Sequence, residues 1–442
     1  NTINPESDFF SLGGHSLLAA RMVNHVRSEF SKDLALSEVF ENPTLQRVAV
    51  LLENRETRRS LPPVKKLVDT PDWHPLSYAQ ARMWFIYTMD PRSTEYNLSG
   101  AMRVAGNFRC DLAQTVVTDI IRKHAPLRSV YKKAADGTGL QQFRDEFEFT
   151  LRERDVSHLP QNEQDMAVRE LIQAEEGYQF DLFTELPFRV LYIHTDKNKG
   201  LLCYTAHHIA VDGWSINILA NEFVERYEAL LSGTHIAQEQ QAISYADYVA
   251  WQRQWLNDSQ LEKQLAYWQH YLANIPAVHN LPLDHARSHE RKKKGNYYQQ
   301  TLSRDVFIRL ENMCLTHNLT LFMCLQAAFA VHLSRWSGES DIVMGAPVAG
   351  RTDQALESMI GLFLNTIVFR TKLEDNPSFL ALLQRTRAEH ITASENGDVP
   401  FELLVERLNP QRSTLHAPVF QIMINMNNTE SSIMPFSGLD FS

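Results

Sequence analysis

Two adjacent histidines and an aspartate offer the chemistry of proton transfer. His207 and His208 directly follow the apolar residues 201–206, and Asp212 stands just before a segment with helical spacing. Histidine is the side chain best able to exchange or orient a proton near neutral pH. The first N–H groups of a helix would also stabilise a developing oxyanion. The pattern therefore predicts a site suited to attack of an amine on an acyl carbonyl.

Plainer interpretations of the same residues stay open. In an arbitrary protein, two histidines at a strand end are more often hydrogen-bonded polar residues than a catalytic pair. Asp212 could be the N-cap of the following helix or half of a buried ion pair, so a structural role comes before a catalytic one. Adjacent histidines point in different directions and Asp212 completes no zinc-ligand spacing, so we expect no metal.

Ser16 is a second residue that could carry chemistry. It closely follows Gly13 and Gly14, which allow a tight turn, and it opens a segment with apolar helical spacing. A serine there can simply cap the helix. Such a serine is also exposed and easily reached, so it could be modified rather than catalytic.

The elements that must position these residues fall into two parts. Residues 1–54 have the pattern of a small α domain of three short helices, and residues 55–72 carry the charge and proline of an extended linker. From residue 73 onward, apolar runs alternate with helical stretches, which indicates an α/β unit. A polar connection near residue 285 suggests two lobes, 73–284 and 285–442. Since three short helices bury little surface, we expect a further helix before the first residue.

Composition narrows the class of protein. The chain has 442 residues, 44% of them hydrophobic and 22% charged, with 43 basic against 53 acidic side chains and a net charge of −10. These values fit a soluble, folded protein and argue against nucleic acid as a partner. No window approaches a membrane span, so we expect no membrane association either.

The cysteines indicate a reducing compartment. The four of them, at 110, 203, 314 and 324, form no CxxC pair, and Cys203 lies in an apolar run typical of a buried free thiol. We therefore expect a cytoplasmic location.

The second part resembles the condensation domains of nonribosomal peptide synthetases. The resemblance rests on seven motifs in order, the third of which is similar to the signature HHxxxDGWS. They are Ser77–Trp84, Lys123–Ser129, His207–Ser215, Tyr245–Trp251, Ile360–Thr366, Asp398–Glu402 and Pro418–Gln421. The string from Asp8 to Leu18 resembles the attachment motif of peptidyl carrier proteins.

The resemblance implies a fold and a set of site residues. It implies two lobes like chloramphenicol acetyltransferase, arranged as a V, after an α-helical carrier bundle. The second motif histidine, His208, would be catalytic beside His207 and Gly213, and Asp212 would pair with an arginine, for which we choose Arg351. Gly213 could offer a backbone N–H to the reaction. His208 could be a general base or could only orient the amine.

The resemblance also implies a cofactor and partners. Ser16 would carry covalent 4′-phosphopantetheine and present the donor acyl group, and the motif wording favours an L-configured donor. Expected partners are a phosphopantetheinyl transferase, an upstream adenylation domain, and downstream acceptor carrier and adenylation domains. The carrier would lack its first helix, and the family normally continues past Ser442.

Departures and competing interpretations concern the finer chemistry. Ala125 stands where the second motif usually has glutamate, and Asn396 and Gly397 replace the usual His-Gln before Asp398.

Trp214 favours condensation over epimerisation, and heterocyclisation domains would replace both histidines. An ester-forming or chain-releasing relative remains an alternative. So does a degenerate docking platform, whose expected sign is loss of the second histidine.

Overall fold

The computed structural model describes residues 3–14, 16–30, 32, 34–53, 64–68, 71–234, 242–256, 258–288, 295–351, 353–411, 413, 415–427 and 440–441. Residues 54–63 and 69–70, which include most of the expected linker, and the basic run 289–294 lie outside them. The chain forms two compact units. Unit 1 comprises residues 1–63, 255–354 and 364–427, and unit 2 comprises residues 64–254, 355–363 and 428–442.

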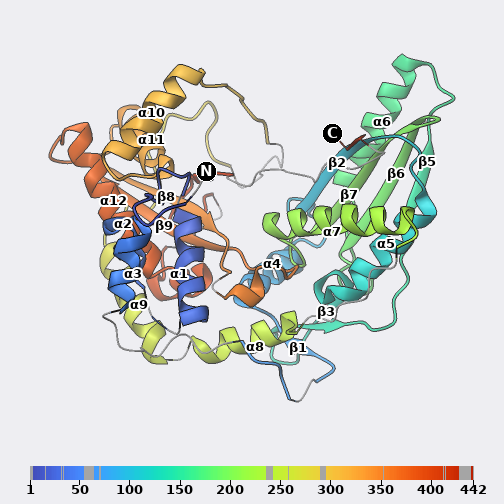
Figure 1. Cartoon of the computed structure of the whole chain (residues 1–442), viewed down its shortest axis with the longest axis horizontal. Helices are drawn as coiled ribbons and strands as arrows, with labels where there is room; N and C mark the ends of the chain where they lie inside the picture. The colour runs from blue at the N-terminus through green and yellow to red at the C-terminus, as the bar shows by residue number, and fades with distance from the viewer. Residues whose placement is uncertain are drawn as a thin grey trace. The chain divides into compact units, whose positions relative to one another are not determined.

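Unit 2 is built on a five-stranded sheet with the strand order β10-β2-β7-β6-β5 (Figure 1). Strands β2 and β6 flank β7 and run antiparallel to it, whereas β5 runs parallel to β6. A smaller sheet has the order β1-β4-β3. The strands are β1 (His74–Pro75), β2 (Asn97–Ala105), β3 (Ser129–Lys133), β4 (Gly139–Phe143), β5 (Arg152–Asp155), β6 (Phe188–Asp196), β7 (Lys199–His207) and β10 (Asp440–Phe441).

The helices of unit 2 cover both faces of the larger sheet. Val190 and Tyr192 of β6 pack in a core with α5 and α7, whereas Leu191 and Ile193 pack with apolar residues of α6. Alternate side chains thus enter opposite buried layers, which explains the nearly continuous apolar runs in these strands. The helices are α4 (Tyr78–Met89), α5 (Cys110–Lys123), α6 (Gln161–Glu176), α7 (Gly213–Leu231) and α8 (Tyr245–Trp255), with a 3₁₀ turn η1 (Ala125–Arg128).

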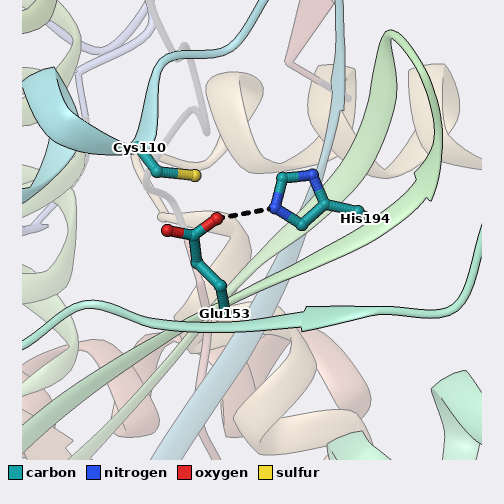
Figure 2. Close-up of side chains that lie close together, drawn as sticks. All are labelled: Cys110, Glu153 and His194. Atoms are coloured by element: carbon teal, nitrogen blue, oxygen red, sulfur yellow. Dashed lines mark hydrogen bonds and ion pairs between the residues drawn. The ribbon is translucent and has the colours of Figure 1, made fainter.

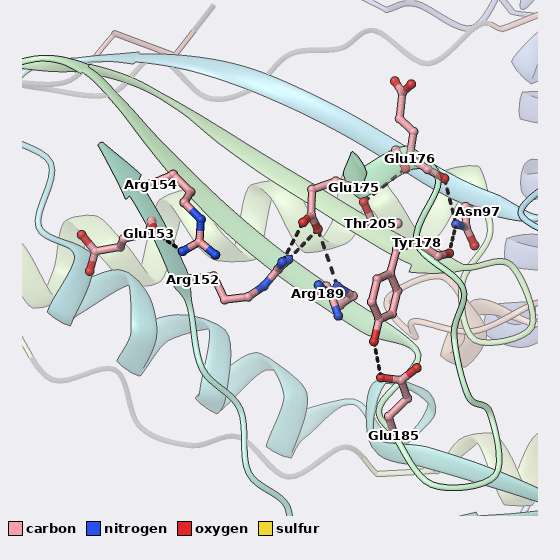
Figure 3. A network of polar contacts seen from close by, with 11 residues as sticks. Asn97, Arg152, Glu153, Arg154, Glu175, Glu176, Tyr178, Glu185, Arg189 and Thr205 are labelled. Atoms are coloured by element: carbon pink, nitrogen blue, oxygen red, sulfur yellow. Dashed lines mark hydrogen bonds and ion pairs between the residues drawn. The ribbon is translucent and has the colours of Figure 1, made fainter. Parts of the chain in front are cut away.

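A polar cluster attaches the end of α6 to this sheet (Figure 3). Arg152 Nη1 on β5 donates to Glu175 Oε1 at 2.6 Å, and Arg189 Nε on β6 lies 3.6 Å from Glu175 Oε2. The Arg189 guanidinium also stacks 3.3 Å from the centre of the Tyr178 ring. Burial by itself would raise the pKa of Glu175, but the two guanidinium groups outweigh it and hold that pKa below its usual range.

Unit 1 contains the three N-terminal helices and a second α/β layer. The N-terminal helices α1 (Ser16–Phe30), α2 (Leu36–Glu41) and α3 (Leu45–Glu53) enclose a small core that includes Val23, Val39 and Val48. In the second layer, β8 pairs antiparallel with β9. Its elements are α9 (Asp258–Tyr271), α10 (Arg304–Thr316), α11 (Leu321–Ser337), β8 (Asp341–Val348), β9 (Asn365–Lys372), α12 (Phe379–Glu395) and α13 (Phe401–Leu408).

Helix α2 joins the N-terminal helices to α12 within unit 1. Phe40 is 1% exposed and packs in one core with Met323 and Ile391. Ser37 Oγ donates to Glu395 Oε1 at 2.8 Å. The buried Phe40 side chain and the hydrogen bond between Ser37 and Glu395 therefore connect the N-terminal helices to α12.

The expected strands are confirmed, and one expected helix is divided. The apolar runs that begin near residues 200, 341 and 366 form β7, β8 and β9. The helical pattern from residue 251 to 272 contains two helices, because α8 ends at Trp255 and α9 begins at Asp258. Within the described ranges, no single helix is long and apolar enough to cross a membrane, although the bent pair α10 and α11 passes that test together, by length and composition.

Candidate active site

The expected acyl-transfer residues lie where β7 turns into α7. Strand β7 ends at His207, residues 208–212 form the connecting loop, and α7 begins at Gly213. Ile209, Ala210 and Val211 are fully buried, so the loop is anchored by its apolar side chains. An anchored loop holds its polar residues in fixed positions, as catalysis requires.

His207 has the environment of a structural residue. Its side chain is 4% exposed, and its Nδ1 accepts a hydrogen bond from the Ile209 N–H at 3.1 Å. The rings of Tyr87 and Phe180 meet its imidazole edge to face. Burial lowers the pKa of His207 to about 4. The imidazole is therefore neutral at pH 7, and its hydrogen bond with Ile209 stabilises the loop that follows it.

His208 differs from its neighbour. Its backbone N–H donates to the Tyr96 carbonyl oxygen at 2.8 Å, which fixes the main chain. Its side chain is partly exposed, and its Nδ1 is buried but has no hydrogen-bond partner among the residues that the structure describes. Buried polar atoms normally find partners. The imidazole of His208 is thus the more exposed and less constrained member of the pair.

Asp212 caps α7 and clamps a distant segment onto it. Its Oδ1 accepts from the Ser215 N–H at 2.8 Å and from the Ser215 hydroxyl at 2.7 Å, and its Oδ2 accepts from the Phe363 N–H at 3.1 Å. The side chain is 1% exposed. The structure thus assigns the N-cap role that the sequence left open.

Gly213 and Trp214 complete the start of α7. An added Cβ at Gly213 would meet open space, so the backbone there is accessible to a ligand. Trp214 Nε1 donates to the Glu357 carbonyl oxygen at 3.1 Å, and the Gly361 N–H donates to Ser215 Oγ at 3.0 Å. Residues 355–363 are therefore held against the first turn of α7. We call residues 355–363 the return segment.

The return segment fits closely against α8. Tyr245 OH donates to the Leu362 carbonyl oxygen at 2.6 Å and lies 3.1 Å from Ser77 Oγ, the N-cap of α4. A Cβ at Gly361 would lie 2.4 Å from the Tyr245 ring, which explains the glycine. Gln80 Nε2 in α4 donates to the Ile209 carbonyl oxygen at 3.2 Å. These contacts support the return segment and the loop of residues 208–212.

Arg351, the expected partner of Asp212, lies in unit 1. It follows β8 and is 7% exposed. The pairing of Arg351 with Asp212 remains a prediction.

Family comparisons can now be set beside this geometry. Residues 71–441 match the condensation domain family, and residues 1–52 match the phosphopantetheine attachment site family. The chain belongs to the condensation-domain family. A carrier domain precedes its condensation domain, so the expected order of the two parts is confirmed.

Similar proteins agree with this membership. The dimodular nonribosomal peptide synthase of Bacillus subtilis is 34% identical over 442 residues, which cover 99% of this chain and 18% of that protein. The X-domain from teicoplanin biosynthesis is 25% identical, with a TM-score of 0.77 over 86% of this chain and 84% of that one. The first condensation domain of the CDA synthetase, 17% identical, shares the fold with a TM-score of 0.66 over 80% and 82%. The chain spans a small part of the curated relatives that it matches.

In the condensation domain, the second motif supports α7. Lys123 Nζ donates to Glu222 Oε1 at 2.6 Å, and His124 Nε2 lies 3.1 Å from Glu222 Oε2. Burial lowers the pKa of His124, although the neighbouring Glu222 raises it in part. Burial would raise the pKa of Glu222, but the hydrogen bonds and charges of His124 and Lys123 outweigh it and bring the pKa to about 2. The departure at Ala125 lies beside this pair, in η1.

The departure before Asp398 is locally well packed. The Asn396 carbonyl oxygen accepts from Trp268 Nε1 at 2.7 Å, and Asn365 Nδ2 donates to the Gly397 carbonyl oxygen at 2.8 Å. Asp398 Oδ2 accepts from Gln264 Nε2 at 3.0 Å. The loop that carries Asn396 and Gly397 is therefore joined to α9 and β9.

The carrier domain fits its covalent group. Ser16 is the first residue of α1, a 15-residue helix, and the N-terminus of a helix favours a phosphate group. The preceding turn is held by Asp8 Oδ1, which accepts from the Ser11 N–H at 2.8 Å. Gly13 has a φ of 98°, which a side chain would strain. Ser16 would hold 4′-phosphopantetheine, whose terminal thiol carries an acyl group when it is bound.

Proposed function

We propose that this chain forms an amide bond between two carrier-bound amino acyl units. The amine of an acceptor aminoacyl group attacks the carbonyl carbon of a donor thioester, and the donor thiol leaves. One observation carries the proposal, namely that His208 keeps a partly exposed imidazole in a loop flanked by the buried, hydrogen-bonded side chains of His207 and Asp212.

Residues at the start of α7 supply the chemistry. His208 takes the proton of the attacking amine or orients that amine. The first N–H groups of a helix lack intrahelical acceptors, and Gly213 is the first residue of α7. Its N–H would stabilise the negative charge that develops on the carbonyl oxygen. Asp212 acts as a positioning residue, because its oxygens hold the helix and the return segment.

The domain limits that support this function are also proposals. Residues 1–54 form the carrier, residues 55–72 the linker, and residues 73–284 and 285–442 the two lobes of the condensation domain. Ser16 presents the donor, in keeping with a carrier that precedes its condensation domain. An acceptor carrier, adenylation domains on either side and a phosphopantetheinyl transferase complete the system, which works on an L-configured donor in the cytoplasm.

The test is intact-protein mass spectrometry. A promiscuous phosphopantetheinyl transferase and an aminoacyl-coenzyme A load Ser16, and an aminoacylated acceptor carrier is then added. We expect a dipeptidyl acceptor from the wild type and a loss of at least 100-fold in His208→Ala, since a positioned acid or base contributes about 10²–10⁴-fold. Ser16→Ala controls for loading, and His158→Ala controls for removal of an imidazole from the loop before α6.

Other outcomes would point elsewhere. If Ser16 is loaded and no aminoacyl acceptor is extended, the chain is a docking platform. Extension of a hydroxyacyl acceptor alone would make it the ester-forming relative. Undiminished dipeptide from His208→Ala would remove His208 from the chemistry.

A further inference from the structure

A cysteine, a glutamate and a histidine converge on unit 2 at a place that the condensation reaction does not use. Cys110 Sγ, a Glu153 carboxylate oxygen and a His194 ring nitrogen all lie within 4.8 Å of one another (Figure 2). His194 Nε2 lies 2.8 Å from Glu153 Oε2. The side chains of Glu153 and His194 are 50% and 34% exposed, so an ion could reach them from solvent.

The fold sets this cluster in place. Because β5 runs parallel to β6 and Asp155 pairs with His194, the side chain of Glu153 lies on the same face of the sheet as that of His194. The register of β6 against β7 shifts just after His194, and such irregularities re-aim side chains. Cys110 is the first residue of α5, which covers that face. Three separate elements thus each contribute one donor.

The chemistry of the donors selects the ion. We propose that Cys110, Glu153 and His194 bind Zn²⁺, with water as the fourth ligand. Sulfur and imidazole donors suit a borderline ion such as Zn²⁺ and disfavour Ca²⁺ and Mg²⁺. In a tetrahedral site the donor atoms stand roughly 3–4 Å apart, as the Zn–S and Zn–N bond lengths require. The 2.8 Å between His194 Nε2 and Glu153 Oε2 and the 4.8 Å limit on the other separations bracket this spacing.

Zn²⁺ binds cysteine as the thiolate. Binding therefore displaces the Cys110 thiol proton to solvent, and the sulfur becomes a thiolate ligand.

The site is structural rather than part of the condensation reaction. His194 pairs with Gly200 at the start of β7, whereas His207 ends that strand. Seven residues of strand correspond to about 23 Å. Bound Zn²⁺ would fasten the start of α5 to the β5 edge of the sheet, and so stabilise unit 2.

Cobalt provides the test, because Co²⁺ occupies tetrahedral zinc sites and absorbs light. The whole chain is stripped with a chelator and titrated with Co²⁺. We expect a thiolate-to-cobalt charge-transfer band in the near ultraviolet at one equivalent, which Zn²⁺ then abolishes by displacement. Zinc at about 100 times its dissociation constant should raise the melting temperature of unit 2 by roughly 5–10 °C.

Substitution of each proposed ligand, with Cys203 as the control, tests which side chains bind the ion. Cys110→Ser should lose the band, while Cys203→Ala, which removes a buried thiol of β7 on the opposite face, should keep it. His194→Gln and Glu153→Gln change half-exposed groups, and each should weaken cobalt binding at least 10-fold even if Cys110→Ser folds poorly. A wild-type chain without the band, a band that survives Cys110→Ser, or unchanged affinity in both glutamine variants would overturn the proposal.

Discussion

Replacement of Asp212 should destabilise unit 2 before it alters any chemistry. Asp212→Ala removes the acceptor of three hydrogen bonds, from the N–H and hydroxyl of Ser215 and the N–H of Phe363. Loss of an N-cap costs about 1 kcal/mol, and each buried donor left without an acceptor costs about 1–3 kcal/mol. Since these terms are not additive, we expect a total of about 3–5 kcal/mol.

The assay must report on unit 2 itself, because two units need not unfold in one step. Hydrogen exchange followed by mass spectrometry resolves the first turn of α7 and the return segment. Both should exchange faster in Asp212→Ala, and the melting temperature should fall by roughly 6–20 °C. The melting temperature of Asp212→Asn should lie between those of the wild type and Asp212→Ala. Asparagine remains a good N-cap, but it can place its amide N–H₂ opposite the N–H of Phe363.

His208→Ala is the matched control, since no hydrogen bond of its side chain is found in the described part of the chain. It should keep the exchange pattern of the wild type and lose condensation. If Asp212→Ala kept wild-type protection and melting temperature but lost condensation, Asp212 would act on the substrate and the positioning role would be refuted.

Four further changes test other parts of the structure. Gly361→Ala would force a methyl group against the Tyr245 ring and should cost about 1–3 kcal/mol, measured by denaturant unfolding. Gly213→Ala adds a methyl group in open space, so the variant should melt like the wild type. The methyl group should crowd a substrate that lies at the first turn of α7 and slow condensation, and a wild-type rate would contradict a substrate at that place. Stabilisation by Glu222, whose folded pKa lies below its ordinary value, is present above about pH 4.5 and is lost as pH falls toward about 2. The gap in unfolding free energy between wild type and Glu222→Gln, about 3 kcal/mol at pH 7, should therefore shrink on acidification, and a constant gap would refute the linkage. Phe40→Ala should cost unit 1 about 3–5 kcal/mol and leave exchange in unit 2 unchanged.

Local pattern predicted much of the architecture. The apolar run before His207 and the helical spacing after Asp212 were enough to place a strand, a loop and a capped helix, because side-chain periodicity reports which faces are buried. The different environments of His207 and His208 could not be read from the sequence. They depend on Tyr87 and Phe180, which come from other parts of the chain.

Contacts between distant segments account for what the sequence missed. The parallel pairing of β5 with β6 brings Glu153 beside His194, and no spacing rule connects either residue with Cys110. Likewise, the return segment follows β8 in the chain but belongs to unit 2. Its attachment depends on Tyr245 and Asp212, whose partners in the return segment are the backbone groups of Leu362 and Phe363.

The return segment also has a consequence for how the protein is made. About 150 residues separate Asp212 from Phe363, so at about 5–20 residues per second the ribosome needs roughly 8–30 s to deliver the partner of that carboxylate. Throughout that interval the return segment is missing, although Ile209 and Val211 in the nascent loop are both fully buried in the finished fold. Substitutions in residues 355–363 should therefore appear first as a lower yield of folded protein and a longer stay on chaperones, before any change in turnover by the molecules that do fold.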